Sequence, residues 1–499
     1  LALIHEIGKR QAMTPISTDQ PRTDRNIVLE ARASRRDLII GASAMAAGAA
    51  LGLGGSSAAQ ETGLPQGTAL VVSPRLPLWD VTAASASAIL DGSATNWLQV
   101  GSPLPHPIRR VGVDGIATNG MPTEASVADY EALVTELASN PGTIAVAPLP
   151  VLDSRVTALR IDGTDPFLAL ATEAEPVFHV GIAGDMIPGR NVNLHMRGYG
   201  DFVFPWRRVA PLLSSFDFTF GNFECVISDT IPFPEDTNAN ALDFVMGSAG
   251  IDGLHLAGFD AVSLANNHSI YNGSGWGFDG FYDTINNLAA AGMPWFGAGE
   301  DLDQARAPHV GEVAGKTIAL IGIDGVTANV DYPGTWMVTS EAGATASKPG
   351  TNPLVEEQIL ADISNLAAQY DIVIPFFHMG EQYRWMLSEW AIELSRRCVD
   401  AGATTVVTSH PHVTQGMEWY DGTPLFYGIG NFIYDQMFTV DTSQGHIVDL
   451  TFRGSEIVGF RLHGVAIEDF TQPRLLGPNE QAAFMDRIWR SNDFIRARV

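Results

Sequence analysis

From Val177 onward, apolar strand-like runs alternate with helical segments, and this alternation restricts the fold more than any other feature of the chain. Strands are predicted at 177–183, 216–220, 261–265, 317–323, 371–377, 404–408, 425–429 and 446–452. Helices are predicted between several of them, at 205–214, 247–257, 276–291, 353–368 and 388–401. Strands that alternate with helices predict a largely parallel sheet whose two faces are covered by helices.

Polar side chains able to bind a metal ion follow several of these strands at the point where each strand ends. They are Asp185, Asn222, Glu224, Asn267, His268, His378, His410 and His412. Ligands of open α/β sheets bind at this edge, outside the carboxyl ends of the strands. Carboxylate, amide and imidazole groups together favour Mn, Fe or Zn over Ca or Mg. The pattern therefore predicts a centre for divalent metal ions.

The sequence His410-Pro-His412 carries a geometric expectation of its own. If the segment is extended, side chains alternate between faces, so both imidazoles lie on one face. That arrangement suits two ligands to one metal ion or to an adjacent pair of ions.

Charge and composition exclude several classes of protein. With 29 Lys and Arg against 56 Asp and Glu, the net charge is −27, which disfavours a nucleic-acid partner or docking on anionic lipid. The only cysteines, Cys225 and Cys398, are too few for a disulfide scaffold or a cysteine-based zinc site. The chain contains neither a G-x-S-x-G elbow nor a G-x-x-x-x-G-K-[ST] loop, so serine hydrolases and P-loop NTPases are disfavoured as well.

Residues 1–59 are predicted to be an export signal region. Arg35-Arg36 precedes a weakly apolar run at 38–53, and Ser57 and Ala59 match a small-residue cleavage site. This is the layout of a twin-arginine signal, and it predicts a periplasmic or extracellular protein. A Sec signal and an uncleaved anchor are the alternatives. We find no other apolar stretch long enough to span a bilayer, so no stable transmembrane span is expected in the mature chain.

A smaller α/β domain is predicted at 60–170, with strands at 68–72 and 143–146 and a helix at 127–139. The spacing from Gly92 to Trp97 and the run from Pro141 to Val146 resemble one lobe of periplasmic phosphate-binding-type solute receptors. A generic α/β accessory domain is the alternative. At the other end of the chain, 471–499 is expected to be a tail or a helix.

The order of motifs in residues 177–470 resembles the calcineurin-like metallophosphoesterases, and more closely the CapA-type capsule and poly-γ-glutamate biosynthesis proteins. The resemblance rests on Gly-Asp-Met-Ile-Pro-Gly-Arg at 184–190, Gly-Asn-Phe-Glu at 221–224, Asn-Asn-His at 266–268, His-Met-Gly-Glu-Gln-Tyr at 378–383, His-Pro-His at 410–412 and Tyr-Gly-Ile-Gly-Asn-Phe-Ile-Tyr-Asp at 427–435. It implies a four-layer αββα metallophosphoesterase-like sandwich preceded by the smaller α/β domain.

The same resemblance implies a role for each polar residue. Asp185 and His412 would bind the first metal, and Glu224, or Asn222, would bridge both metals. The second metal would be completed by Asn267, His378 and His410. His268 would protonate the leaving group, and Arg190 is a candidate clamp for an anion.

One departure from the wider superfamily affects the expected function. The superfamily usually has Asp-x-His in its first motif, whereas Met186 and Ile187 follow Asp185 here. We expect an exported metal-dependent hydrolase of phosphoester type, acting on an envelope polymer or on a phosphorylated small molecule or lipid. A non-catalytic binding or assembly component of a polymer synthesis or export complex is the alternative, as is an anion-sensing protein.

Overall fold

The structure is a computed structural model of the chain. It describes residues 63–233, 242, 244–270, 277–332 and 342–498. The predicted export signal lies outside the described residues. Residues 55–499 form one compact unit. Within the described residues, no helix is long and apolar enough to cross a membrane.

The first sheet of the main domain is mixed and has the order β13-β12-β9-β8-β24-β25-β26, with β23 added beside the end of β8. Parallel pairing joins β8 to β9 and β9 to β12, and antiparallel pairing joins β8, β24, β25 and β26. The strands are β8 (Val177–Met186), β9 (Phe218–Phe223), β12 (Ala261–Ser263), β13 (Trp295–Phe296), β23 (Asn431–Ile433), β24 (Gln444–Arg453), β25 (Glu456–Glu468) and β26 (Gln472–Leu475).

The second sheet has the order β15-β16-β19-β20-β22-β21, with β18 beside β16. Its central strands β16, β19, β20 and β22 run parallel, and antiparallel strands flank them on both sides. The strands are β15 (His309–Val313), β16 (Lys316–Asn329), β18 (Pro353–Leu354), β19 (Ile372–His378), β20 (Val406–Ser409), β21 (Thr414–Tyr420) and β22 (Thr423–Ile429).

The two sheets pack face to face through a shared apolar core. Phe220 of the first sheet meets Phe376 of the second with ring centroids 5.8 Å apart, and both rings are buried. Ile182, Leu450 and Ile374 belong to the same cluster. Strands that are buried on both faces are almost continuously apolar, and this explains the long hydrophobic runs of the sequence.

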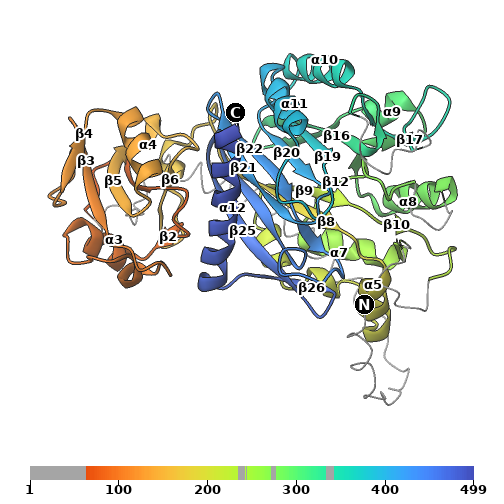
Figure 1. Cartoon of the computed structure of the whole chain (residues 1–499), viewed down its shortest axis with the longest axis horizontal. Coiled ribbons are helices and arrows are strands. Elements are labelled where there is room, and N and C mark those ends of the chain that lie inside the picture. The colour runs from red at the N-terminus through yellow and green to blue at the C-terminus, as the bar shows by residue number, and fades with distance from the viewer. Residues whose placement is uncertain (1–62, 234–241, 243, 271–276, 333–341, 499) are drawn as a thin grey trace. The chain divides into compact units, whose positions relative to one another are not determined.

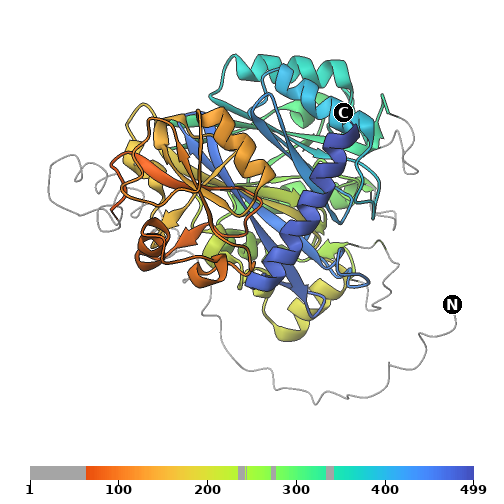
Figure 2. The same cartoon turned by 60° about the vertical axis from the view of Figure 1, so that its left-hand side comes forward.

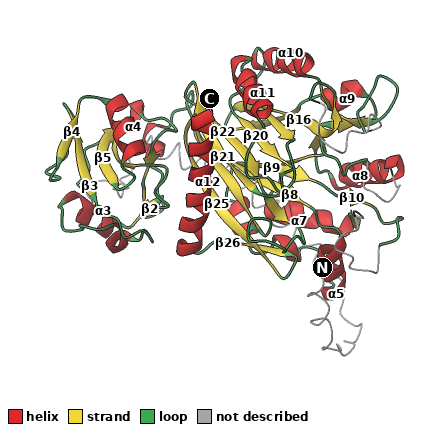
Figure 3. Cartoon of the chain, in the orientation of Figure 1, coloured by secondary structure: helices red, strands yellow, loops and turns green. Residues whose placement is uncertain are grey.

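Helices cover the two outer faces, which gives four layers (Figure 3). Over the first sheet lie α5 (Arg190–Tyr199), α6 (Ala210–Leu213), α7 (Ile251–Ala257) and α8 (Gly277–Ala291), whose buried side chains share one core with its strands. Over the second lie α10 (Glu356–Ala367) and α11 (Glu389–Asp400). The predicted αββα sandwich is thereby confirmed, while the expectation of one largely parallel sheet is wrong, because the strands divide between two mixed sheets.

Several predicted helices are shorter than expected, among them 247–257, where α7 begins only at Ile251, and 127–139, where α4 (Tyr130–Ser139) begins only at Tyr130. The segment 205–214 is divided into a short 3-10 turn, η4 (Phe204–Trp206), and α6. Residues Pro353–Leu354 pair with β16 as β18, so the following helix begins only at Glu356. In the first segment Pro211 stands in the interior of the predicted helix, where it lacks the N–H that a continuous helix needs, and it is accommodated in the first turn of α6 instead.

Short elements connect these layers. They are β10 (Val226–Ile227), β11 (Val245–Met246), η5 (Ser248–Gly250), β14 (Ala298–Gly299), α9 (Leu302–Arg306) and β17 (Gly350–Thr351). The last helix, α12 (Pro478–Arg498), is the dark blue helix of Figures 1 and 2 and lies along β21 and β25. Its Phe484, Ile488 and Trp489 are buried in the core between the sheets.

The smaller N-terminal part has a mixed five-stranded sheet with the order β4-β3-β5-β1-β6. Its elements are β1 (Thr68–Val72), β2 (Asp80–Val81), α3 (Ala83–Leu90), η1 (Trp97–Val100), β3 (Arg109–Val113), β4 (Ala125–Val127), α4 (Tyr130–Ser139), β5 (Thr143–Pro148), η2 (Leu149–Val151), β6 (Thr157–Ala158), β7 (Arg160–Ile161) and η3 (Pro166–Leu170). The indole N–H of the buried Trp97 donates to the carbonyl of Gly142, 2.9 Å away, which ties together the two sequence features singled out in this part.

Candidate metal centre

The fold gathers the polar strand ends into two facing rows, one from each sheet. In the first sheet, Asp185 of β8 is in register with Asn222 of β9 on one side and with Asn431 of β23 on the other. In the second sheet, His378 of β19 is in register with Ser409 of β20. Since the sheets face each other, the two rows meet at one edge of the sandwich.

A close backbone approach seats Asp185 in its row. The amide N–H of Asp185 donates to the carbonyl of Gly430 at 3.0 Å. A Cβ atom added to Gly184 would stand 2.0 Å from that same carbonyl oxygen, so position 184 requires glycine. Gly184 of the first motif and Gly430 of the 427–435 motif therefore meet in one close backbone contact.

Two groups of buried ligand atoms result, and they share Glu224. Asp185, Glu224 and His412 form the first group, and Glu224, His378 and His410 form the second, with the ligand atoms of each group within 4.8 Å of one another. Asn267 Oδ1 joins the second group, at 2.7 Å from His378 Nε2. All of the ligand residues predicted from the resemblance are thus brought together, with Glu224 placed between the groups.

Asn222 does not lie at the bridging position, which was predicted for it as an alternative to Glu224. Its side-chain amide donates to Asp185 Oδ1 at 2.8 Å and to Glu224 Oε2 at 3.2 Å. Its own carbonyl oxygen accepts a hydrogen bond of 3.0 Å from Asn266. Asn222 therefore holds the two carboxylates in position with its N–H groups.

The donor set fits a pair of divalent cations. Glu224 Oε1 is buried and has no hydrogen-bond partner in the part of the chain that the structure describes; its nearest ionic contact is His378 Nε2 at 3.4 Å. His378 Nε2 also lies 3.2 Å from His410 Nδ1. Leaving a buried carboxylate oxygen unpaired is costly, and a cation among these atoms removes that cost.

Burial and mutual contact shift the acidity of every group in the centre. Burial raises the pKa of Glu224, and it lowers the pKa values of His268 and His410 well below their usual range, with neighbouring imidazoles adding to the effect. Burial also opposes the charged forms of Asp185 and His412, but their contact outweighs it, lowering the pKa of Asp185 and raising that of His412. Imidazoles that stay neutral are the form that binds metal.

The expectation that His-Pro-His is extended is wrong. β20 ends at Ser409, and both histidines have left-handed backbones, with φ of 100° at His410 and 57° at His412. The turn separates their ring centroids by 5.9 Å, and each ring joins a different group. Non-glycine residues held at positive φ are strained and collect at functional sites, and this turn places one histidine in each of the two groups.

His268 lies beside the bridging carboxylate. Its Nε2 is 3.7 Å from Glu224 Oε1, and the ring of Phe244 packs against it with centroids 4.5 Å apart. Its Nδ1 is buried without a hydrogen-bond partner among the described residues. The nitrogen of His268 that faces the ligand groups is therefore Nε2.

Arg190, the predicted anion clamp, is held by a carboxylate. Its Nε donates to Asp435 Oδ2 at 3.2 Å, its Nη2 contacts Asp435 Oδ1, and the guanidinium lies 4.9 Å from the centroid of the Phe244 ring and 5.1 Å from that of Tyr434. Two contacts were not predicted individually: Asp435 as the partner of Arg190, and Asn431, whose Oδ1 is 2.8 Å from His412 Nδ1. The Gly-Asn-Phe-Ile-Tyr-Asp stretch was the signal that could have revealed both.

Met186 and Ile187 fill the place of the motif's missing histidine with apolar side chains. Both are fully buried in the core beneath the helices of the first sheet. The first group therefore has three ligand residues, whereas the second has Asn267 in addition to its three.

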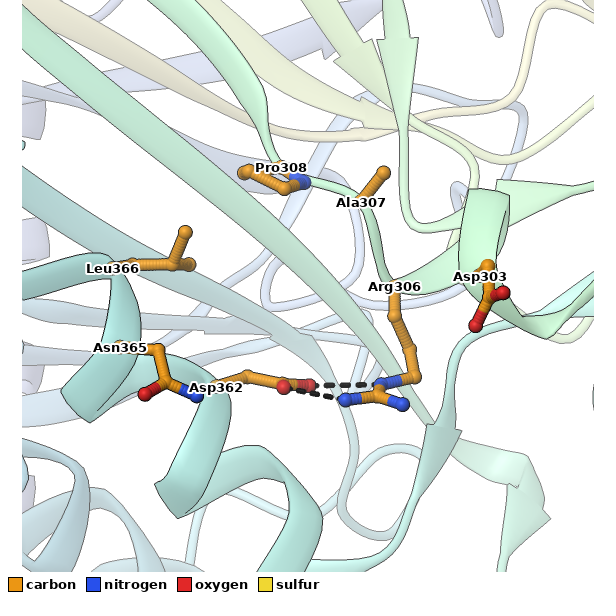
Figure 4. Close-up of a pocket in the computed structure, with 7 residues that line it drawn as sticks. All are labelled: Asp303, Arg306, Ala307, Pro308, Asp362, Asn365 and Leu366. Carbon is orange, nitrogen blue, oxygen red and sulfur yellow. Dashed lines mark hydrogen bonds and ion pairs between the residues drawn. The ribbon is translucent and has the colours of Figure 1, made fainter. Parts of the chain in front are cut away.

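Another cavity, of about 230 Å³, lies beside α9 and α10 (Figure 4). Its guanidinium, Arg306, already donates to Asp362 at 3.0 and 2.6 Å. Because the Arg306 guanidinium is already paired with Asp362, it does not mark this cavity as an anion-binding site.

Fold and site together define a four-layer α/β sandwich with a buried carboxylate–histidine cluster at one edge of its sheets. The model of the family described as "Bacterial capsule synthesis protein PGA_cap" matches residues 179–436, more than half of the chain. The chain belongs to this family, so the predicted relationship to CapA-type proteins is confirmed.

Curated relatives agree with this membership. The chain is 28% identical over 308 residues to "Capsule biosynthesis protein CapA" of Bacillus anthracis, covering 60% of this chain and 70% of that protein. It is 29% identical over 272 residues to "PGA biosynthesis protein CapA" of Bacillus subtilis, covering 54% of this chain and 66% of the relative.

Solved structures are more distant. The calcineurin-like phosphoesterase YfkN from Bacillus subtilis is 13% identical, with a TM-score of 0.34, over 64% of this chain and 99% of that one. An ABC-type phosphate transport receptor from Vibrio cholerae is 22% identical, with a TM-score of 0.19, over 20% of this chain and 48% of the receptor.

Proposed function

We propose that this capsule and poly-glutamate biosynthesis family member is an exported, metal-dependent hydrolase of a phosphoester in envelope polymer synthesis. The observation that carries the proposal is the pair of buried ligand groups joined by Glu224, whose Oε1 lacks a hydrogen-bond partner among the described residues. Asp185 and His412 would hold one ion, and Asn267, His378 and His410 the other. Two such ions supply the charge that stabilises both the attacking and the leaving oxygen of a phosphoryl group.

The protein's own side chains would complete the reaction. His268 would donate a proton to the departing oxygen through Nε2, the ring nitrogen that lies 3.7 Å from Glu224 Oε1. Burial keeps the pKa of His268 low, but a bound phosphate dianion would raise it, because a nearby negative charge favours the imidazolium. Asn222 and Asn431 would hold the ligands Asp185 and His412 in place.

A binding or assembly role without turnover is the second proposal. The apolar Met186 and Ile187 favour it, because they remove one ligand from the first metal position. The hydrolase requires both bound metal and turnover, whereas the assembly role requires no turnover, so metal content and turnover together separate the two proposals.

The experiment is elemental analysis of the exported protein from its own host, beside a His410→Ala/His412→Ala variant. About two equivalents of Mn, Fe or Zn in the wild type, lost in the variant, would support the centre and justify a screen of phosphoesters. Metal without turnover of any ester would leave the assembly role. Absence of metal from both proteins would contradict the hydrolase.

Export is proposed separately, from Arg35-Arg36 and the apolar run after them. Changing both residues by Arg35→Lys and Arg36→Lys is expected to retain the full-length chain in the cytoplasm in cell fractionation. Normal export of this variant would contradict a twin-arginine route, because that route reads the guanidinium pair.

A further inference from the structure

A cavity of about 260 Å³ lies next to the metal centre, and nothing above assigns it a role. Val413 and Thr414, which directly follow the ligand His412, line one side, and Tyr383 and Trp385 line another. The ring of Tyr383 is 6.2 Å from that of His412, and its amide N–H donates to the carbonyl of Pro411 at 2.8 Å. Tyr383 thus stands between the cavity and the ligands of the first metal group.

Tyr383 and Trp385 of the cavity wall, together with Phe438, which contacts Tyr383, are exposed side chains that we call the aromatic rim. Their exposures are 46%, 50% and 63%, although large apolar side chains are seldom this accessible together. Tyr383 and Phe438 touch edge to face, with centroids 5.4 Å apart. Tyr383 also has a left-handed backbone, φ 62°, which holds its ring at the rim against local strain.

The cations of the cavity are already neutralised. Arg487 pairs with Asp441 at 3.4 Å, and Arg490 pairs with Asp486 at 2.5 Å. The whole chain carries a charge of −27, so a long polyanion would be repelled as it approached. What this surface offers to a ligand is chiefly apolar area beside a centre suited to phosphate.

We propose that the rim and cavity bind the alkyl chain of an amphipathic phosphoester while its phosphate occupies the metal centre. The inference rests on the proposed function for the phosphate end of the ligand, and it names the substrate class of that same site. Tyr383 lines the cavity and its ring lies 6.2 Å from that of His412, so an alkyl chain in the cavity would be one aromatic side chain away from the phosphate. The hydrophobic effect would then make affinity increase with chain length.

The test uses non-hydrolysable alkylphosphonates, from methyl- to octylphosphonate, with the metal-loaded full chain in calorimetry. Wild-type affinity is expected to increase by up to about fourfold for each added methylene until the cavity is filled. In a Trp385→Ser/Phe438→Ser variant that retains its metal, we expect this dependence on chain length to disappear. A matched control, Leu98→Ser, removes an equally exposed apolar side chain from η1 of the N-terminal part and should leave the dependence unchanged.

The outcomes separate this inference from the proposed function. Equal affinity for all phosphonates in the wild type would overturn the inference, even if small phosphoesters are hydrolysed. Chain-length dependence without turnover of any ester would support the inference and contradict the hydrolase. If phosphatidylcholine vesicles bound to the wild type and not to the variant, with a flat phosphonate series, the rim would be a membrane-contact surface and the inference would again fail.

Discussion

Two buried clusters join carboxylates to imidazoles, one within the main domain and one between the main domain and Asp165 of the N-terminal part, and they differ in where their positive charge comes from. At the metal centre, Asp185 and Glu224 face four imidazoles, and Arg190 is engaged by Asp435. In the second cluster, around Asp449, the guanidinium of Arg461 lies 3.3 Å from Asp449 and 3.2 Å from Asp165.

The Asp449 cluster is satisfied from within the chain. His179 and His463 approach Asp449 at 3.0 and 3.2 Å, and Arg160 approaches Asp165 at 3.4 Å. Burial opposes the charge of Asp449, but the hydrogen bonds of both histidines and the charge of Arg461 hold its pKa well below the usual value. The comparison teaches that supply of cations, and not the number of histidines, separates a structural network from a metal centre.

The largest expected effect comes from removing the cation of the structural network. Arg461→Met leaves Asp449 and Asp165 buried without their shared partner, and should lower the free energy of unfolding by about 3–5 kcal/mol. Urea denaturation measures it, and metal content per folded molecule should not change. The control, Arg208→Met, breaks an exposed pair with Glu468 and should cost at most about 1 kcal/mol. Equal losses in both variants would contradict the distinction.

Removing the charge of Glu224 from the metal centre should raise the free energy of unfolding once metal is absent, the opposite of the effect expected at Arg461. In EDTA, Glu224→Gln is expected to be more stable than the wild type by about 1–3 kcal/mol, because it removes a buried carboxylate with an unpaired oxygen. With metal present, the order of stability should reverse. Thermal unfolding with and without EDTA measures both, and a variant less stable in both conditions would show that the carboxylate is not metal-dependent.

The next prediction is that the two groups of the metal centre hold their ions with unequal affinity. The first group lacks the amide ligand that Asn267 gives to the second, so its ion should leave at a chelator concentration about tenfold lower. His412→Ala should then remove only the weaker equivalent, and His410→Ala the tighter one. Chelator titration followed by elemental analysis measures this; simultaneous loss in every protein would contradict two unequal sites.

The smallest expected effect concerns His446, which is buried against Phe484 and is not paired with a carboxylate among the described residues. Burial, with the charge of His463, lowers its pKa to about 3, so the unfolded chain binds the proton first as the pH falls below about 6.5. Between pH 6.5 and 5.5 the wild type should lose about 1 kcal/mol of stability that His446→Leu keeps. Urea denaturation at the two pH values measures this, and parallel losses would contradict the buried neutral imidazole.

How far the site could be predicted depends on the kind of signal each residue carries. Strand ends are visible in sequence, so Asp185, Glu224 and His378 could be expected at one edge before their distances were known. Asn431 and Asp435 could not be assigned, because their roles depend on β23 lying beside β8 and on Arg190 reaching across. The turn at His410 was missed because positive φ in a histidine leaves no compositional trace.

The sequence by itself determined the alternation of strands and helices, the kinds of ligand atom and the family, since these follow from periodicity and motif order. Only the tertiary structure decided that Asn222 donates to both carboxylates, that Arg190 pairs with Asp435, and that the Asp449 cluster supplies its own cations. The physical reason is that charge compensation in a buried site depends on distances between strands far apart in sequence. Periodicity in the sequence indicates on which face of a strand or helix a side chain lies, but not which charged group it contacts there.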